Sequence, residues 1–161
     1  MPVVEIHKDT KALTMTVVAQ FAAPVARVWA AYADPRQLER FWGPPEWPAT
    51  FERHDFTVGG RSEYYMTGPN GEKSGGFWEF LSIEAPRSFE VKDGFLGPDG
   101  KQAPDMPTMR MQFTFEPQDG GTRMVTLTTF PSVDALEKLL AMGMEEGLKA
   151  AMSQIDGVLA E

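Results

Sequence analysis

The chain is 161 residues long, with a formal net charge of -8, a pI near 4.8 and 42% hydrophobic residues. This length lets one domain bury a core without disulfide or metal support, so we predict a single domain over 1–161 with its core at about 12–160. The acidic balance argues against binding to nucleic acid or anionic lipid, because both depend on clustered Lys and Arg. The absence of Cys excludes disulfides, thiolate catalysis and Cys-ligated metal sites.

The sequence gives no sign of a membrane or export segment. No apolar run approaches the roughly 20 residues that span a bilayer. The opening stretch "MPVVEIHKDTK" lacks the charged head and apolar core of a signal peptide. We therefore expect no membrane insertion, a cytoplasmic location and a frayed N-terminus that includes His7.

The first predicted elements are a strand and two short helices. Residues 12–21, "ALTMTVVAQF", are rich in β-branched side chains and partly alternate, which predicts a strand. Apolar spacing predicts a helix that begins at Pro24 and ends before Pro35, since a residue preceding Pro avoids the α region. A second helix is predicted over 35–42, "PRQLERFW".

The middle of the chain predicts an antiparallel meander, because its strand-like segments are bounded by Gly, Pro or Asp-Gly. The six predicted strands cover 49–56, 60–67, 75–84, 87–95, 108–117 and 122–130. "GPNGEK" and "PQDGG" are predicted hairpin loops. The longer segment 97–107, "GPDGKQAPDMP", is typical of a lid or binding loop.

The pattern returns to a helical period from Ser132 to about Leu159, with Ser132 as the predicted N-cap. At about 1.5 Å per residue this helix would be roughly 40 Å long, enough to cross the sheet. Gly143 and Gly147 interrupt it, and each Gly costs roughly 1 kcal/mol relative to Ala. Close packing of the helix on the sheet would compensate for this cost, and so would space left for a ligand.

This order of elements predicts an α+β fold. We expect a curved antiparallel sheet of seven strands, two short helices after the first strand, and one long C-terminal helix packed across the sheet.

Several ordered stretches resemble a known family: "FAAPVARVWAAYADPRQLERFWGP", "HDFTVGGRSEYYMTGPNGEKSGGFWEFLSIEAPRSFEV", "GGTRMVTLTTF" and "LLAMGMEEGLKAAMSQIDGVL". Over roughly 12–160 the chain is similar to the activator-of-heat-shock-protein-90-ATPase homologue family of START-like (SRPBCC, birch-pollen-allergen-like) helix-grip domains. The resemblance implies a deep cavity between the long helix and the concave sheet, which the superfamily uses to hold lipids, sterols, polyketides or hormones. It supplies no shared catalytic motif, and the family name does not define an activity.

The candidate ligand cavity would combine aromatic and Met side chains with a few polar groups that orient the ligand, such as Tyr64, Tyr65, Glu79 or Arg110. The candidate cavity residues are Trp29, Trp42, Trp47, Tyr64, Tyr65, Trp78, Glu79, Arg110, Gly143, Met144 and Gly147.

The sequence leaves the orientation of two groups of side chains open. In "FWEFLSI" both strand faces carry aromatics, so alternation does not decide whether Trp78 or Glu79 faces the cavity. If Glu79 does, it would be a buried acid with a raised pKa that could anchor a ligand or accept a proton. In "ERFWGPPEWPATF", residues 39–51, Trp42 and Trp47 either plug the end of the core or form the rim of the cavity.

Other chemistry-bearing motifs favour structural interpretations. His54 shares its predicted strand face with Glu52 and Thr50, but no second His lies at ligand spacing and no nucleophile elbow is present, so a surface or hydrogen-bonded His is expected. "GPNGEKSGG" lacks the Gly-Lys-Ser/Thr ending of a phosphate loop and is expected to be a hairpin. We predict no catalytic residue, no metal and no cofactor.

The leading functional hypothesis is a non-enzymatic protein that binds a small hydrophobic or aromatic ligand in the cavity. The second is a cyclase- or hydrolase-type enzyme that uses a cavity carboxylate or Tyr as acid and base. The third is a chaperone-accessory interaction domain, suggested by the family name. We expect no nucleic-acid partner, and a monomer or a homodimer.

Overall fold

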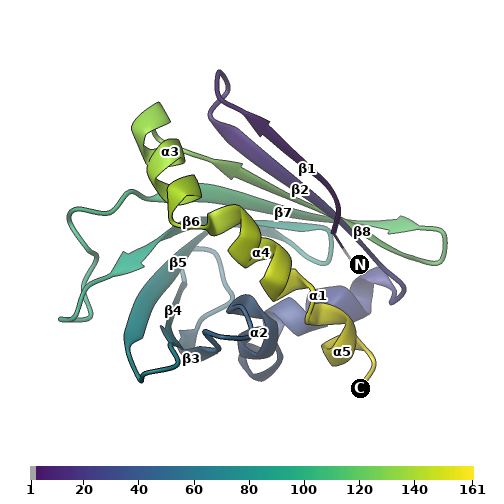
Figure 1. Cartoon of the computed structure of the whole chain (residues 1–161). Coiled ribbons are helices and arrows are strands. Elements are labelled where there is room, and N and C mark those ends of the chain that lie inside the picture. Colours follow the sequence, from purple (N-terminus) through teal and green to yellow (C-terminus); the bar gives the residue numbers. More distant parts are fainter. Residues whose placement is uncertain (1–2) are drawn as a thin grey trace.

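The computed structural model describes residues 3–161 and contains an open, curved antiparallel sheet that wraps around the C-terminal helices (Figure 1). The strands pair in the order β1-β2-β8-β7-β6-β5-β4-β3. Their bounds are β1 (Val3–Asp9), β2 (Thr14–Phe21), β3 (Ala49–His54), β4 (Arg61–Thr67), β5 (Lys73–Glu84), β6 (Ser88–Leu96), β7 (Met109–Gln118) and β8 (Gly121–Thr129). The predicted α+β architecture, an antiparallel sheet with C-terminal helix packed across it, is confirmed.

The sheet has eight strands within residues 3–161, so the prediction of seven was wrong. The additional strand is β1, which pairs antiparallel with β2 where a frayed end was expected. Asp9 closes the β1–β2 turn, since its Oδ1 accepts hydrogen bonds from the backbone N–H groups of Lys11 and Ala12. Sequence alternation missed β1 because it is an edge strand whose side chains, His7 included, are largely exposed.

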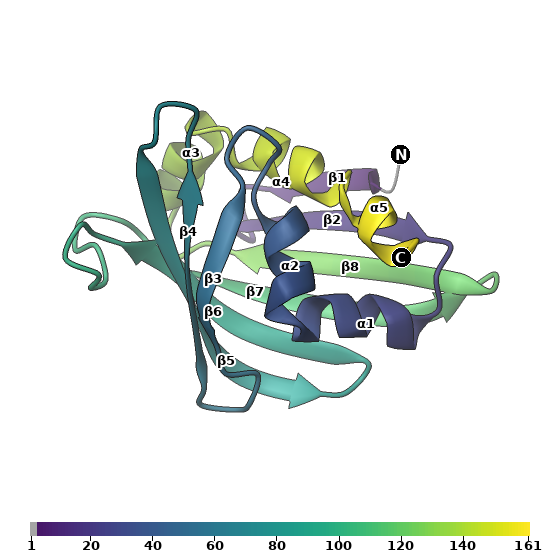
Figure 2. The ribbon, with the colours of Figure 1, turned by 90° about the horizontal axis from the view of Figure 1, so that it is seen from below.

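Two short helices cover one end of the concave face, α1 (Val25–Ala33) and α2 (Pro35–Trp42) (Figure 2). Asp34 ends α1 in an extended conformation and caps α2, because its Oδ1 accepts a hydrogen bond of 2.9 Å from the Arg36 N–H. Pro35 occupies the first turn of α2, where the missing N–H costs nothing. Both predicted helices are therefore present, to within a residue at each end.

The C-terminal helix is broken into α3 (Val133–Ala141), α4 (Met144–Met152) and α5 (Ile155–Leu159), so the prediction of one continuous helix is corrected. The first break occurs at Gly143, whose φ of +90° lies outside the helical region. The second break follows Met152, where the Gln154 N–H bonds to the Ala151 carbonyl in a tighter turn. The three segments still follow one another across the concave face (Figure 1).

Strand β5 directs Trp78 and Phe80 toward the concave core, and this decides the orientation that alternation left open. Phe77 points to the convex face, yet it is fully buried. The Arg61 guanidinium lies 4.3 Å from the centre of its ring, and Gly94 leaves room for it, since a Cβ there would lie 2.6 Å from the ring. Both faces of β5 therefore carry buried aromatic residues, Trp78 and Phe80 within the core and Phe77 beneath Arg61.

A bulge in β3 changes the face on which His54 lies. The register passes from Phe51 opposite Tyr64 to Arg53 opposite Glu63, so Glu52 is the extra residue. His54 therefore joins Phe51 on the concave face. Strict alternation had predicted that His54 shares a face with Glu52, and this prediction was wrong. The sequence offers no Gly or Pro that would mark this bulge.

The two helix-interrupting glycines should respond oppositely to substitution by Ala. Gly143→Ala places a Cβ on a left-handed residue and should lower the free energy of unfolding by about 1 kcal/mol. Gly147→Ala lies inside α4 with no heavy atom within 4 Å of the new Cβ, and should raise the free energy by up to about 1 kcal/mol. Urea denaturation of both variants measures this difference, and equal effects would contradict the assigned break.

Candidate ligand-binding cavity

A pocket of about 280 Å³, the inner pocket, lies between the α3–α4 region and the concave face of the sheet. Its walls are mainly apolar, and five methionines contribute to them. The lining residues are Trp42, Pro44, Tyr64, Met66, Asp93, Phe95, Met109, Met111, Leu139, Met142, Gly143, Met144, Gly147 and Leu148. Met142 and Gly143 are exposed, so the pocket reaches the surface at the α3–α4 break.

The glycines of the C-terminal region leave open space beside the pocket. A Cβ placed on Gly143 or on Gly147 meets no heavy atom within 4 Å. Close packing of the helix on the sheet therefore does not explain these two glycines. Gly143 serves the chain reversal between α3 and α4, and Gly147 leaves unfilled a position that lines the inner pocket.

Asp93 is the one acidic side chain in the inner-pocket lining, and it is 8% exposed. It projects from β6 on the concave face, opposite Trp78 of β5 and Met109 of β7. Its Oδ1 is buried and has no hydrogen-bond partner among residues 3–161. A buried carboxyl oxygen without a protein partner is costly in an apolar pocket.

Burial raises the pKa of the Asp93 carboxyl to about 7. The nearby Tyr64 hydroxyl, the Gly94 N–H and the Trp78 indole favour the ionised form and lower that pKa in part. They do not balance the burial, because the Trp78 Nε1 also lacks a partner in hydrogen-bonding geometry within the described chain. Asp93 therefore changes charge near neutral pH.

Tyr64 reaches Asp93 because glycine lies across from it in the sheet. Tyr64 of β4 pairs with Gly76 of β5, and a Cβ on Gly76 would lie 2.5 Å from the Tyr64 hydroxyl oxygen. Burial, together with the charge of Asp93, raises the pKa of Tyr64 well above its ordinary value, so the hydroxyl stays protonated. Next to it, the buried Trp42 Nε1 has no partner among residues 3–161. An unpartnered indole donor therefore lies beside Tyr64.

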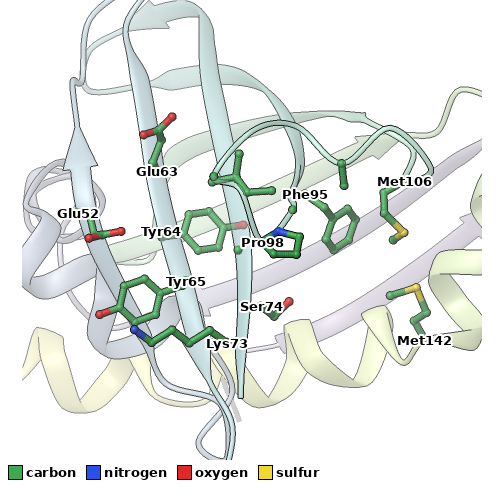
Figure 3. Close-up of a pocket in the computed structure, with 15 residues that line it drawn as sticks. Glu52, Glu63, Tyr64, Tyr65, Lys73, Ser74, Phe95, Pro98, Met106 and Met142 are labelled. Carbon is green, nitrogen blue, oxygen red and sulfur yellow. The ribbon is translucent and has the colours of Figure 1, made fainter. Parts of the chain in front are cut away.

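A second pocket of about 620 Å³, the outer pocket, adjoins the inner one and shares Tyr64, Phe95 and Met142 with it (Figure 3). The loop 97–107, expected to be a lid or binding loop, lines it with Gly97, Pro98, Gly100, Ala103 and Met106. Two acids and one base also line it, namely Glu52, Glu63 and Lys73.

Five of the eleven predicted cavity residues line the inner pocket: Trp42, Tyr64, Gly143, Met144 and Gly147. Trp42 and Trp47 point in different directions. Trp42 is 8% exposed and packs edge-to-face on Trp78 with a centroid distance of 4.8 Å. Trp47 is half-buried beside Gly68 in the β4–β5 hairpin. The alternatives of plug and rim are thus resolved, because Trp42 forms a wall and Trp47 lies outside the inner pocket.

Three more predicted aromatics do not line the inner pocket. Trp78 is fully buried beneath Trp42, as part of the core. Trp29 packs from α1 against Phe115, with ring centroids 5.5 Å apart. Tyr65 points to the opposite face from Tyr64, where Lys73 Nζ lies 4.3 Å from its ring centre and both residues line the outer pocket.

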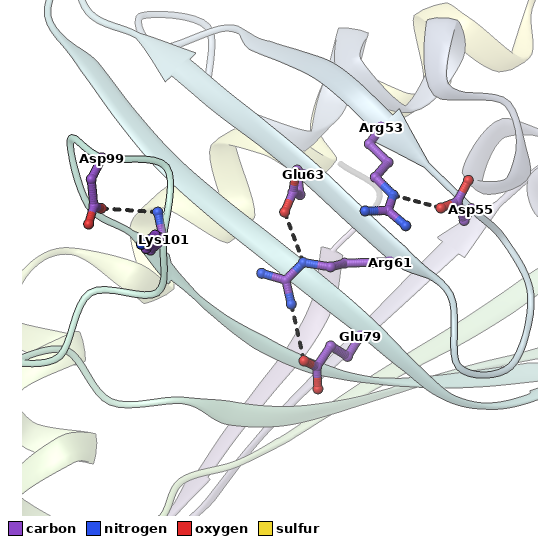
Figure 4. A network of polar contacts seen from close by, with 7 residues as sticks. All are labelled: Arg53, Asp55, Arg61, Glu63, Glu79, Asp99 and Lys101. Atoms are coloured by element: carbon purple, nitrogen blue, oxygen red, sulfur yellow. Dashed lines mark hydrogen bonds and ion pairs between the residues drawn. The ribbon is translucent and has the colours of Figure 1, made fainter.

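The two predicted charged residues lie away from the inner pocket. Glu79 accepts a hydrogen bond of 3.1 Å from Arg61, which also binds Glu63, on the convex face (Figure 4). It is therefore not the buried acid that the sequence allowed. Arg110 is exposed on β7 and forms an ion pair with Glu90. Both expectations are corrected because strand alternation places these side chains outward once Trp78 faces inward.

Sequence reasoning missed Asp93, although a signal was present. Phe89, Val91 and Asp93 alternate along β6 on one face, so a carboxyl interrupts an otherwise apolar row. Asp93 falls inside the predicted strand 87–95, but the sequence does not show which face of that strand is buried.

His54 is held in a fixed orientation away from the inner-pocket lining. Its Nε2 donates to the Tyr32 carbonyl at 3.0 Å, and this tautomer lets Nδ1 accept from the Ser62 hydroxyl at 2.7 Å. Burial lowers its pKa, which favours the neutral ring. This agrees with the expected hydrogen-bonded His.

Comparisons with known proteins identify the family. The family described as Activator of Hsp90 ATPase homolog 1-like protein matches residues 22–160. The chain belongs to this family. The resemblance to the START-like family predicted from sequence is thereby confirmed. Among curated proteins, none matches the chain.

Several solved protein structures share the fold over almost the whole chain. A protein from Mycobacterium smegmatis is 47% identical with a TM-score of 0.91, and the alignment covers 98% of this chain and 97% of that one. A protein from Arthrobacter aurescens is 50% identical with a TM-score of 0.95, covering 98% and 92%. A Staphylococcus epidermidis protein is 27% identical with a TM-score of 0.85, covering 98% and 94%. Within residues 3–161, no helix has the length and apolar character to cross a membrane.

Asp93 should make stability depend on pH in a defined direction. Its pKa is higher in the folded chain, at about 7, than in the unfolded chain, so the folded state holds the proton more tightly. As the pH rises from about 4 to about 7, the free energy of unfolding of wild type should fall relative to that of Asp93→Asn, by up to about 1.4 kcal/mol per pH unit. Urea denaturation of both proteins across this range measures the difference. A difference independent of pH would contradict the burial of an ionisable carboxyl.

Proposed function

We propose that the protein binds a small, largely apolar or aromatic molecule in the inner pocket, between α3–α4 and the sheet. The observation that carries this proposal is the combination of an apolar pocket with one buried carboxyl oxygen that lacks a protein partner. Pockets for small molecules commonly have this composition, an apolar wall with few polar groups that fix orientation.

The methionine content supports a binding role. Met66, Met109, Met111, Met142 and Met144 all line the inner pocket. Their unbranched side chains adapt to ligands of different shape, and their thioethers contact aromatic rings favourably. Met144 and Leu148 on α4 are half-buried and pack against the core, so they supply apolar contact on the helix side of the inner pocket.

Binding is favoured over acid–base catalysis by the state of the two candidate groups. A pair that exchanges protons needs two groups that titrate near working pH. Asp93 does so, but the pKa of Tyr64 is raised well above 10 and this hydroxyl remains a donor. Asp93 and Tyr64 together therefore suit orientation of a ligand better than proton transfer in both directions.

A protein-interaction role is less well supported. Among residues 3–161, the exposed large apolar side chains are Val4, Val58, Leu81, Val133 and Met142. They belong to five separate segments of the chain, and single exposed apolar residues are ordinary on protein surfaces. The cytoplasmic location expected from the sequence remains part of this proposal, together with a monomeric or homodimeric state.

Filling the pocket should weaken binding without unfolding the protein. Gly147→Leu adds four carbon atoms at a position that lines the inner pocket and has no heavy atom within 4 Å of the new Cβ. We expect affinity for a small neutral hydrophobic probe such as phenylpropanol, followed by calorimetric titration, to fall by about tenfold or more, which is ~1.4 kcal/mol.

Gly157→Leu is the matched control, because Gly157 also lies in a C-terminal helix with open space around its Cβ but does not line the pocket. This variant should bind within about twofold of wild type. Native mass spectrometry of wild type purified from its own host would then look for a co-purifying small molecule. Equal affinity of both variants would place the probe elsewhere and contradict the proposal.

A further inference from the structure

We propose that the inner pocket selects organic amines, with a protonated ammonium paired to the Asp93 carboxylate and an apolar body among the aromatic and Met side chains. This inference rests on the proposed function and names the chemical class of its ligand.

The charges around the inner pocket favour a cation. Asp93 is the one charged side chain among its lining residues, and no Lys, Arg or His of residues 3–161 contributes to that lining. The Oδ1 of Asp93 is buried and unpartnered within the described chain, so an ammonium N–H would supply the missing hydrogen bond together with the opposite charge. An anionic ligand would find no basic side chain and would face the charge of Asp93.

The apolar walls are also suited to a cation. Trp42, Tyr64 and Phe95 present aromatic rings, whose faces attract ammonium groups. The thioether sulfurs of the methionines are polarisable and can lie near a positive charge. These groups offset part of the cost of removing water from the ammonium, which a purely aliphatic pocket would not.

The surroundings of the inner pocket do not oppose the entry of a cation. The outer pocket shares Tyr64, Phe95 and Met142 with it and carries Glu52 and Lys73, while its Glu63 is paired with Arg61. The chain as a whole has a net charge of -8. This net charge attracts cations to the molecule and repels anions.

Asp93 is the group that sets the pH dependence of binding. Tyr64 from β4 is the other titratable side chain of the inner-pocket lining, and it stays protonated. The other elements packed around Asp93 contribute only side chains that do not titrate. These are Trp42 from α2, Trp78 from β5, Met109 and Met111 from β7, Leu139 from α3, and Met144 and Leu148 from α4. His54 lies on the same face but is held by Ser62 and Tyr32.

The volume limits the ligand to a small amine. About 280 Å³ corresponds to roughly nine water molecules at ~30 Å³ each. A phenylalkylamine of about ten non-hydrogen atoms matches this space. Phenylpropylamine, phenylpropanol and phenylpropanoate have nearly the same body and differ in charge, so they form a matched set of probes.

The test is calorimetric titration of these three probes at about pH 6 and pH 8. At pH 8 the amine should bind at least about tenfold more tightly than the alcohol, and the carboxylate most weakly. Affinity for the amine should rise roughly tenfold from pH 6 to pH 8, because Asp93, with a pKa of about 7, becomes ionised while the ammonium keeps its proton. At pH 6 amine binding should release a proton to the buffer.

Asp93→Asn should remove both the preference for the amine over the alcohol and its pH dependence. The pH dependence of wild type tests the inference even if this variant folds poorly. Equal binding of amine and alcohol, or tightest binding of the carboxylate with affinity falling as pH rises, overturns the inference and leaves the proposed function standing. If no probe binds and the Gly147→Leu experiment also shows no effect, both proposals fail.

Discussion

The packing of aromatic side chains on the concave face of the sheet determines where the hydrophobic core is dense and where a pocket remains. Near α1, Trp29 and Tyr32 pack on Phe89, Phe113 and Phe115, with Phe89 and Phe113 stacked at a centroid distance of 4.5 Å. Rings of this size bury much apolar surface and leave little free volume. Toward α3 and α4 this ring packing gives way to a mixed lining, in which Trp42, Tyr64 and Phe95 stand beside methionines and glycines. The inner pocket lies at this end of the concave face.

The break in the C-terminal helix belongs to the same arrangement. A continuous helix would carry its apolar stripe straight across the sheet, whereas the left-handed Gly143 redirects the chain between α3 and α4. This places the exposed Met142 where the inner and outer pockets meet, and Gly143 in the inner-pocket lining. Both glycines lower helix stability, and close packing offsets the cost at neither of them. At Gly143 the change of chain direction requires a left-handed residue, whereas at Gly147 the missing side chain leaves open space beside the inner pocket.

Asp93 illustrates a balance between stability and binding. A carboxyl in an apolar pocket costs stability when it ionises, and its neighbours Tyr64 and Trp78 only partly offset this cost. Fold stability alone does not account for an acid at this position, since Met109 on the neighbouring strand shows that an apolar residue fits the same row. The cost of the acid is understandable if the missing partner is supplied by a ligand.

The sequence by itself determined the fold class and most of the elements, because alternation, prolines and caps such as Asp34 act over a few residues. It also placed Trp42, Tyr64, Gly143, Met144 and Gly147 among the candidates. Only the tertiary structure decided which strand face looks inward. The bulge at Glu52 and the pairing of Tyr64 with Gly76 depend on how neighbouring strands pair, which the residue pattern within a single strand does not show. Asp93 became the buried acid in place of Glu79 for the same reason, because the environment of a side chain is set by what packs against it.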